Sequence, residues 1–324
     1  MASGGAAPDD EHVRTTARGP RVVLVIPTFN RARLVGHAID SALSQDYPDV
    51  RVVVVDDGST DDTSAAVARF AAEPRVRVVW RERNGGVMAA KNSGIDALPA
   101  DCDYFGILDS DDVLVPSAIG VLVRAFEASR TPLSQVFGWC ADADTGEYTG
   151  VAPHRAGPIT YQDALCGRFE GEFWQLIRRA ALGDRRFDER AGGNEAMVWW
   201  PMLKESPGLL VDTVVRKYDR SGADRVNRPS FTQRGAERKM WGYRAYLERT
   251  ATDTGSSCPA RLAELWLEHA KWAAFAGHWR ACVGSLTHAW RANPSWRVAK
   301  VALLALAPSP LLRAAYARLH RDTR

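Results

Sequence analysis

The sequence predicts an α/β protein with a Rossmann-like domain in its first half and an α-helical region at its C-terminus. Three observations in the 324 residues support this prediction. Short apolar, β-branched runs alternate with helix-patterned segments from residue 21 to about 128. Acidic clusters follow two of these runs, and the chain from Pro229 onward is rich in Ala, Arg, Leu and Trp. Apolar strands that are separated by helices indicate a parallel sheet covered on both faces.

The first four strands are expected where the apolar runs stand, at residues 22–26, 52–55, 76–80 and 104–108. Between and after them, apolar residues recur with helical spacing. Ser59 to Asp62 are suitable N-caps for the second helix, and Pro116 suits the first position of the fourth. The expected helices cover residues 34–43, 59–70, 87–98 and 116–128.

The rest of the chain is less regular up to residue 228. We expect strands at 173–178 and 209–218 and a helix at 195–204. The segment 265–294 resembles one helix-turn-helix hairpin of the tetratricopeptide kind, with Gly277 at its turn. These patterns predict a disordered tail over 1–19, an α/β domain over 20–228 and a helical region over 229–324.

The composition is that of an ordinary globular protein, with 46% hydrophobic and 25% charged residues. It excludes collagen-like and largely disordered chains. The net charge, 42 basic minus 39 acidic residues or +3, does not indicate nucleic-acid binding. Arginine far outnumbers the six lysines, which is typical of a GC-rich bacterial genome.

Cysteine usage and apolar segments predict where the protein resides. Five cysteines without a CxxC spacing predict neither a zinc site nor a disulfide framework, and they indicate a reducing compartment. Residues 1–19 contain no apolar run, so no signal peptide is expected. The longest apolar stretch, 301–307, is far shorter than the roughly 20 residues that span a bilayer. We therefore expect a soluble, cytoplasmic protein.

Two acidic clusters follow the second and the fourth expected strand. In an open α/β sheet, ligands bind outside the carboxyl ends of the strands. Asp56 and Asp57 can there accept hydrogen bonds from a base or a ribose, although Asp-Asp-Gly-Ser is also a good turn and helix cap. The run from Asp109 to Asp112 holds three carboxylates in four residues, and a hard divalent cation would relieve their repulsion.

Five ordered blocks of sequence resemble those of family 2 glycosyltransferases with the GT-A fold. The blocks are VLVIPTFNR (23–31), SALSQDYP (41–48), VDDGSTD (55–61), NGG with AKNSGI (84–95) and ILDSDDVLVP (107–116). The resemblance implies a Rossmann-like nucleotide-binding half with a mixed sheet over 20–115 and an acceptor half over 116–228. It covers residues 21–128 closely and 170–222 loosely.

The resemblance also implies an activity. It predicts a metal-dependent, inverting transfer of a sugar from a nucleotide-diphosphate sugar, with a UDP-sugar favoured, and Mg²⁺ or Mn²⁺ as cofactor. The acceptor would be a hydroxyl of a glycan, a lipid-linked saccharide or a natural product. A nucleotidyltransferase is disfavoured, because no glycine-rich phosphate loop follows the first strand.

By position, the resemblance assigns roles to individual residues. Phe29 and its neighbours would form the base pocket, and Asp57 would bind the base, with Asp56 beside it. Lys91 stands where the family usually has an arginine, near the nucleotide. Asp111 and Asp112 would bind the metal, with Asp109 as an alternative ligand. The expected donor-binding residues are Pro27, Thr28, Phe29, Asn30, Asp56, Asp57, Lys91, Asp109 and Asp111.

The general base expected of an inverting enzyme is Glu195. Family members often carry a Glu-Asp pair about eight residues after Phe-Asp-Glu; here Phe187-Asp188-Glu189 is followed by Glu195 and then by alanine. Asp188 and Glu189 are alternative bases, and Glu195 is alternatively a carboxylate that favours a helix start. The missing second acid leaves a non-catalytic, degenerate transferase that serves as a binding or scaffold protein as the alternative function.

Two further features concern metal and acceptor. Many relatives carry a histidine soon after the strand that ends here at Tyr218, but this chain has none; Asp219, Asp224 or the arginines Arg220 and Arg225 are the candidate substitutes. Trp199 and Trp200 follow the candidate base and offer either core packing or a platform for a sugar ring.

The C-terminal residues 296–324 contain six basic residues and one acidic residue, with apolar stretches between them. They predict either a peripheral contact with the inner face of an anionic membrane or a solvated helix pair. The sequence leaves the oligomeric state open.

Overall fold

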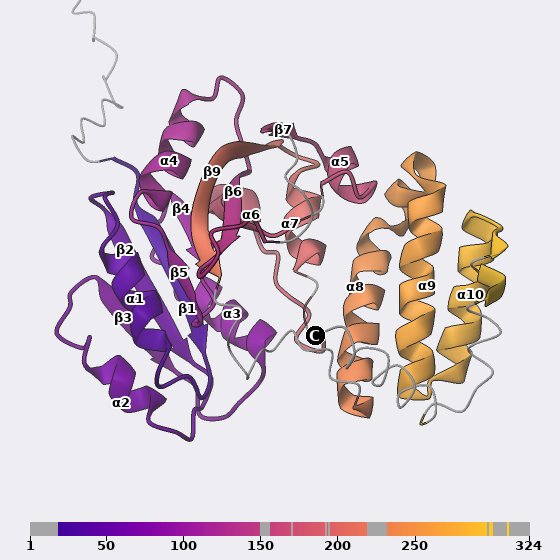
Figure 1. The fold of residues 1–324 in the computed structure, drawn as a ribbon, viewed down its shortest axis with the longest axis horizontal. Helices are drawn as coiled ribbons and strands as arrows, with labels where there is room; N and C mark the ends of the chain where they lie inside the picture. Colours follow the sequence, from indigo (N-terminus) through magenta and orange to yellow (C-terminus); the bar gives the residue numbers. More distant parts are fainter. Residues whose placement is uncertain are drawn as a thin grey trace, which may run out of the picture.

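The computed structural model of this protein describes residues 19–149, 156–169, 171–191, 193, 195–218, 232–296, 298–300 and 310. Within these ranges the chain forms a sheet domain, and three long helices stand side by side next to it (Figure 1). The expected tail, apart from Gly19, lies outside the described residues, and so does most of the basic C-terminus. The division into domains at residues 20, 116 and 229 stays a prediction.

The described strands form one mixed, nine-stranded sheet. Its order is β3-β2-β1-β4-β8-β6-β9-β5, and β7 pairs with β9. The strands β1 to β4 pair in parallel, whereas β8 is antiparallel to β4 and β6, and β9 is antiparallel to β5. The strands are β1 (Val22–Thr28), β2 (Val50–Asp56), β3 (Val76–Trp80), β4 (Tyr104–Ile107), β5 (Asp112–Leu114), β6 (Gln135–Asp142), β7 (Gly157–Ile159), β8 (Phe173–Arg178) and β9 (Gly208–Tyr218). This confirms the predicted fold class.

Helices cover both faces of the sheet because the central strands are apolar on both sides. Along β1, Leu24 and Ile26 face a core that includes α1 and α4, and Val23 and Val25 face a core that includes α3 and α7. The helices of this domain are α1 (Val35–Leu43), α2 (Thr63–Ala68), α3 (Val87–Asp96), α4 (Ala118–Ala128), α5 (Tyr161–Leu165), α6 (Arg179–Leu182) and α7 (Ala196–Met202).

The helix bounds differ from expectation mainly at their N-termini. The second helix begins at Thr63 and not at 59, because Ser59 and Thr60 bond the loop at Asn30 instead. The fourth begins at Ala118, two residues after Pro116. The sequence did not predict β5, β6, β7, α5 or α6.

The C-terminal region is a row of three helices, α8 (Gln233–Ser257), α9 (Pro259–Ala276) and α10 (Trp279–Ala292). Gly277 ends α9 in the left-handed conformation, with φ +82°, so the expected turn is confirmed. Tyr246 of α8 and Trp266 of α9 belong to the same buried cluster as Met88 of α3 and Trp199 of α7. The helical region therefore packs on the α3 and α7 side of the sheet domain.

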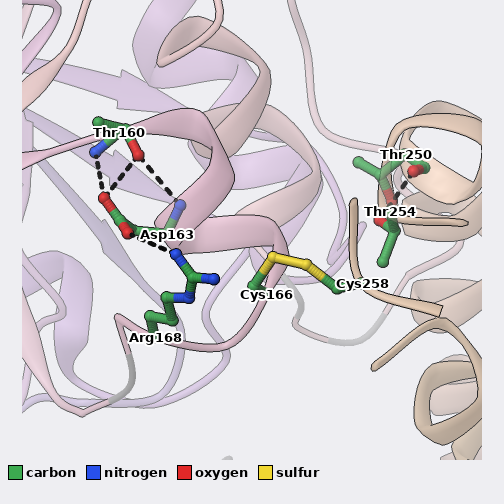
Figure 2. Close-up of a disulfide and its surroundings, with 7 residues drawn as sticks. All are labelled: Thr160, Asp163, Cys166, Arg168, Thr250, Thr254 and Cys258. Atoms are coloured by element: carbon green, nitrogen blue, oxygen red, sulfur yellow. Dashed lines mark hydrogen bonds and ion pairs between the residues drawn. A yellow bond between two sulfur atoms is a disulfide. The ribbon is translucent and has the colours of Figure 1, made fainter. Parts of the chain in front are cut away.

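A disulfide joins the two parts of the chain. Cys166, directly after α5, is bonded to Cys258, between α8 and α9, with a Cα–Cα distance of 5.5 Å (Figure 2). The expectation that the cysteines form no disulfide is wrong for this pair, because folding brings together residues 92 positions apart. A Thr160–Asp163 capping box holds the start of α5 in place.

Within the described ranges, no helix is long and apolar enough to cross a membrane.

Candidate active site

The carboxyl ends of β1, β2 and β4 lie at one edge of the sheet, where the acidic clusters were expected to meet. In the parallel register Thr28 of β1 pairs with Asp56 of β2, and Val25 pairs with Ile107 of β4. Asp56 is buried and accepts a hydrogen bond from the Ser59 amide at 3.0 Å. Its carboxylate therefore shapes the turn after β2.

Asp57 anchors the loop that leads into α3. Its carboxylate accepts hydrogen bonds from the amides of Gly85 at 3.0 Å and Gly86 at 2.8 Å, and it forms an ion pair with Arg81. The side chain is only 2% exposed. The Gly85 amide also lies 3.2 Å from the second oxygen, so four contacts occupy the about four lone-pair positions of this carboxylate, and a bound base would have to replace one of them. Binding of a base by Asp57 stays a prediction.

The expected base-pocket residues lie at the carboxyl end of β1. Pro27 and Thr28 are the last residues of the strand, and Phe29 is 38% exposed beside them. Asn30 adopts φ +51°, and its side chain accepts a hydrogen bond from the Thr60 amide at 2.8 Å. This loop is thus fixed to the loop after β2, with one aromatic ring open to a ligand.

Lys91 brings two distant acidic residues together. It lies on α3, is 3% exposed, and forms ion pairs with Asp109 after β4, at 3.2 Å, and with Glu195 before α7. Burial opposes the charged ammonium, but the two carboxylates outweigh this effect and raise the pKa of Lys91. The structure therefore places the expected base, Glu195, beside the acidic loop.

Glu195 borders a cavity of about 180 Å³, whose lining includes Lys91, Asp109, Trp200 and Arg216. Lys91 contacts Oε1 of Glu195, while Oε2 accepts a long hydrogen bond, 3.4 Å, from the Trp199 indole. The carboxylate is 37% exposed, so a second molecule can reach it.

The alternative bases are engaged elsewhere. Asp188 pairs with Arg190 at 2.6 Å, and hydrogen bonds from this arginine lower the pKa of Asp188. Glu189 accepts a hydrogen bond at 3.2 Å from Asn92, the neighbour of Lys91.

Trp199, one of the two candidate platforms for a sugar ring, is 5% exposed and packs edge-on against Phe187, so it is a core residue.

Arg216 on β9 is a site residue that sequence reasoning missed. It donates to Asp112 at 2.7 Å and to Cys140 Sγ at 3.1 Å, and it lies 3.6 Å from Glu172. Antiparallel pairing of β5 with β9 places it there, because Leu114 is opposite Arg216. The available signal was a charged residue directly after Val214 and Val215 in an apolar strand.

The three carboxylates of the acidic loop have different environments. Asp109 pairs with Lys91, and Asp112, 1% exposed, pairs with Arg216. Burial raises the pKa of Asp112 to about 8, with the guanidinium opposing. Between them, Asp111 forms no hydrogen bond or ion pair through its side chain within the described ranges. Burial, and then the Asp109 charge, raise the pKa of Asp111.

This donor set fits a divalent cation only together with a ligand. No cluster of three or more metal-ligating side chains occurs among the described residues. Mg²⁺, however, is usually held by one or two carboxylates plus substrate phosphates. Asp111 offers such a carboxylate, whereas Asp112 as a ligand stays a prediction. The proposed substitutes for the missing histidine, in 219–225, lie outside the described residues.

Residues 23–185 match the family model described as glycosyl transferase family 2. The chain belongs to this family. It is therefore a glycosyltransferase that uses a nucleotide sugar. A GalNAc(5)-diNAcBac-PP-undecaprenol beta-1,3-glucosyltransferase from Campylobacter jejuni is 30% identical to this chain over 234 residues. The matched region covers 70% of this chain and 71% of that protein.

Solved structures of glycosyltransferases share the fold. S. aureus TarS 1-349 in complex with UDP-GlcNAc has a TM-score of 0.63 at 17% identity, covering 92% of this chain and 87% of that one. The mannosyltransferase PcManGT from Pyrobaculum calidifontis, in complex with GDP-Man and Mn²⁺, has a TM-score of 0.56 at 19% identity, with 93% and 87% covered. The predicted GT-A fold is thus confirmed.

Proposed function

We propose that this family 2 glycosyltransferase transfers a hexose from a UDP-sugar to the hydroxyl of an acceptor with inversion, and that Glu195 is the general base. The observation that carries the proposal is the double ion pair of Lys91 with Asp109 and Glu195. It joins the acidic loop, which suits a nucleotide diphosphate, to a carboxylate that suits proton transfer.

The donor would lie along the edge formed by β1, β2 and β4. The exposed Phe29 ring would contact the base, and Asp57 would accept a hydrogen bond from it. UDP as the nucleotide is supported by the TarS complex with UDP-GlcNAc, which has the same fold. The PcManGT complex with GDP-Man makes GDP the comparison to test.

A divalent cation, Mg²⁺ or Mn²⁺, would be held by Asp111 together with the donor diphosphate. When bound, it would supply positive charge to the diphosphate leaving group. The two cations that line the smaller cavity are committed to other carboxylates: Lys91 to Asp109 and Glu195, and Arg216 to Asp112. They keep the acidic loop in place while the side chain of Asp111 stays open.

Glu195 would take the proton of the attacking hydroxyl through Oε2. Its ion pair with Lys91 fixes the orientation of the carboxylate, since Oε1 is held by the ammonium. General-base catalysis typically contributes about 10²–10⁴ in rate, which is a large effect for a single carboxylate.

The acceptor and the location are proposed more broadly. The Campylobacter relative is named for a saccharide linked to undecaprenol, which supports a lipid-linked saccharide among the acceptor classes. A cytoplasmic location and a membrane contact through the basic C-terminus stay predictions, since residues 301–309 and 311–324 lie outside the described residues. The disulfide between Cys166 and Cys258 favours an oxidising compartment over a reducing one, because cytosolic thiols are kept reduced.

A panel of UDP- and GDP-sugars, assayed for thermal stabilisation and for turnover with and without Mn²⁺, tests the proposal. We expect a UDP-sugar to raise the melting temperature in the presence of Mn²⁺ and to be hydrolysed or transferred. Full turnover in excess EDTA would contradict metal dependence. A donor that binds but is neither hydrolysed nor transferred would favour the non-catalytic alternative, with Ala196 marking the lost acid.

A further inference from the structure

A second and larger cavity, of about 420 Å³, lies between the sheet domain and the helices α8 and α9. It adjoins the smaller cavity, because Gly171, Phe173 and Trp200 line both. Glu195 borders the smaller cavity, and its neighbour Ala196 borders the larger one. The candidate base therefore stands at the boundary between the two spaces.

The walls of the larger cavity are rich in aromatic rings. Phe169 and Phe173 stack with centroids 4.1 Å apart and an interplanar angle of 12°, and Trp200 meets Phe169 edge-on at 5.7 Å. Tyr243 and Tyr246 line the cavity from α8. Phe169 and Tyr246 are buried, so the half-buried rings of Phe173, Trp200 and Tyr243 provide the aromatic surface that the apolar face of a sugar ring would contact.

Among the described residues that line this cavity, the charged groups other than Lys239 are paired. Arg261 pairs with Glu264 at 3.1 Å, and Glu268 pairs with Lys271 at 2.5 Å. Lys239 of α8 also lines the cavity, and no ion pair or hydrogen bond of its ammonium is found within the described ranges. Burial lowers the pKa of Lys239, because it takes water away from the ammonium.

The Lys239 ammonium points toward the chain that carries the candidate base. A Cβ atom added at Gly193 would lie 3.6 Å from Nζ. Gly193 has φ +97°, a conformation that disfavours a side chain, so residue 193 itself places no side chain over the ammonium. An anion bound at Nζ would lie near Gly193, two residues before Glu195 in the sequence.

We propose that the larger cavity binds the acceptor, and that this acceptor is a saccharide with an anionic group, a phosphate or a carboxylate, that pairs with Lys239. The inference rests on the proposed function, because it assumes a sugar acceptor beside Glu195. A partly buried ammonium that has no counter-ion in the described part of the chain gains most from an anionic ligand, and the rings around it gain from a sugar.

Ligand-observed NMR titrations of the full chain, saturated with UDP and Mn²⁺ to block the donor site, test this proposal. The probes are glucose 1-phosphate, methyl glucuronide and the uncharged methyl glucoside. We expect at least one anionic probe to bind about tenfold more tightly than methyl glucoside, equivalent to ~1.4 kcal/mol. Preference for glucose 1-phosphate would identify a phosphate acceptor, and preference for methyl glucuronide a carboxylate acceptor.

Variants attribute the preference to Lys239. Lys239→Gln should abolish it and Lys239→Arg should restore it, while Arg238→Gln, which removes an exposed charge one residue away on α8, should leave it intact. Equal affinity for charged and uncharged probes, or a preference that survives in Lys239→Gln, would overturn the proposal. UDP affinity is measured in the same samples. If the parent protein does not bind UDP, the proposed function is contradicted, and not this inference alone.

Discussion

The two cavities that meet at Glu195 are built in different ways. The smaller one is lined by Lys91 of α3 and Asp109 after β4, and the other donor-binding candidates stand at the carboxyl ends of β1 and β2 or directly after them. The larger one is formed by α5, β8, α7, α8 and α9, which come from distant parts of the chain. Its two walls are joined by the disulfide between Cys166 and Cys258 (Figure 2).

Because of this difference, we expect a single substitution to affect a smaller part of the molecule at the sheet edge than in the larger cavity. At the sheet edge, backbone register positions each carboxylate, so a substitution there removes one chemical group and leaves the rest in place. In the larger cavity the positions depend on helix docking, so a change at the junction affects the whole wall. The predictions below test this contrast, from the largest expected effect to the smallest.

Glu195 lies where the two cavities meet, and its loss should affect the chemical step alone. Glu195→Gln keeps size and polarity but removes the base, so we expect kcat to fall by about 10²–10⁴ while donor affinity stays near the parental value. Transfer kinetics and UDP titrations of the same samples measure the two quantities.

Glu172→Gln is the matched control, because Glu172 faces Arg216 in the same region but does not contact Lys91. We expect its kcat to stay close to parental. Glu189→Gln and Asp188→Asn should likewise lose little. If Glu195→Gln keeps more than roughly a tenth of parental turnover while one of these controls collapses, the base is that other residue.

Lys91 pairs both with Asp109 of the acidic loop and with Glu195, so its removal should destabilise the folded protein. Lys91→Met leaves Asp109 and Glu195 without their cation, and breaking a buried ion pair costs about 3–5 kcal/mol. Because these carboxylates are 47% and 37% exposed, we expect the lower end of that range in urea unfolding. Lys204→Met is the control: this exposed lysine pairs with Asp253 at 3.0 Å, and such pairs contribute about 0–1 kcal/mol. Equal losses in the two variants would contradict the prediction.

The disulfide should stabilise the larger cavity without affecting donor binding. It closes a segment of 92 residues, and native disulfides typically contribute about 2–4 kcal/mol. We expect reductant to lower the melting temperature of the parent but not of a Cys166→Ser, Cys258→Ser double variant. UDP affinity should remain unchanged.

Alkylation and mass spectrometry of protein from cells test the compartment. A reduced pair of cysteines would support the cytoplasmic prediction, and an oxidised pair would contradict it.

Asp57 should act on the donor side alone. Asp57→Ala should weaken UDP binding by about 1–3 kcal/mol, the cost of a donor left unpaired in a desolvated site. Binding of the anionic probes in the larger cavity should not change. Arg81→Met removes the ion-pair partner of Asp57 and keeps its carboxylate, so an equal loss in both variants would show that Asp57 acts only by holding the loop.

The sequence predicted the parts that depend on local pattern. Apolar alternation identified β1 to β4 and helices between them, because residues on both sides of a central strand must be buried. It also placed the two acidic clusters at one edge, since parallel strands end on the same side. The motif blocks indicated the family, and helical spacing with Gly277 predicted the hairpin of α9 and α10.

Only the tertiary structure decided how these parts meet. The pairing of Lys91 with Glu195 joins residues 104 positions apart, and so does that of Asp112 with Arg216. The cavity around Lys239 and the bond between Cys166 and Cys258 likewise depend on α8 and α9 docking onto the sheet domain. Local pattern determines whether a residue is buried and in which kind of element, but it leaves open which distant element packs against it. The partner of each buried charge is therefore fixed by packing and strand register, which exist only in the folded chain.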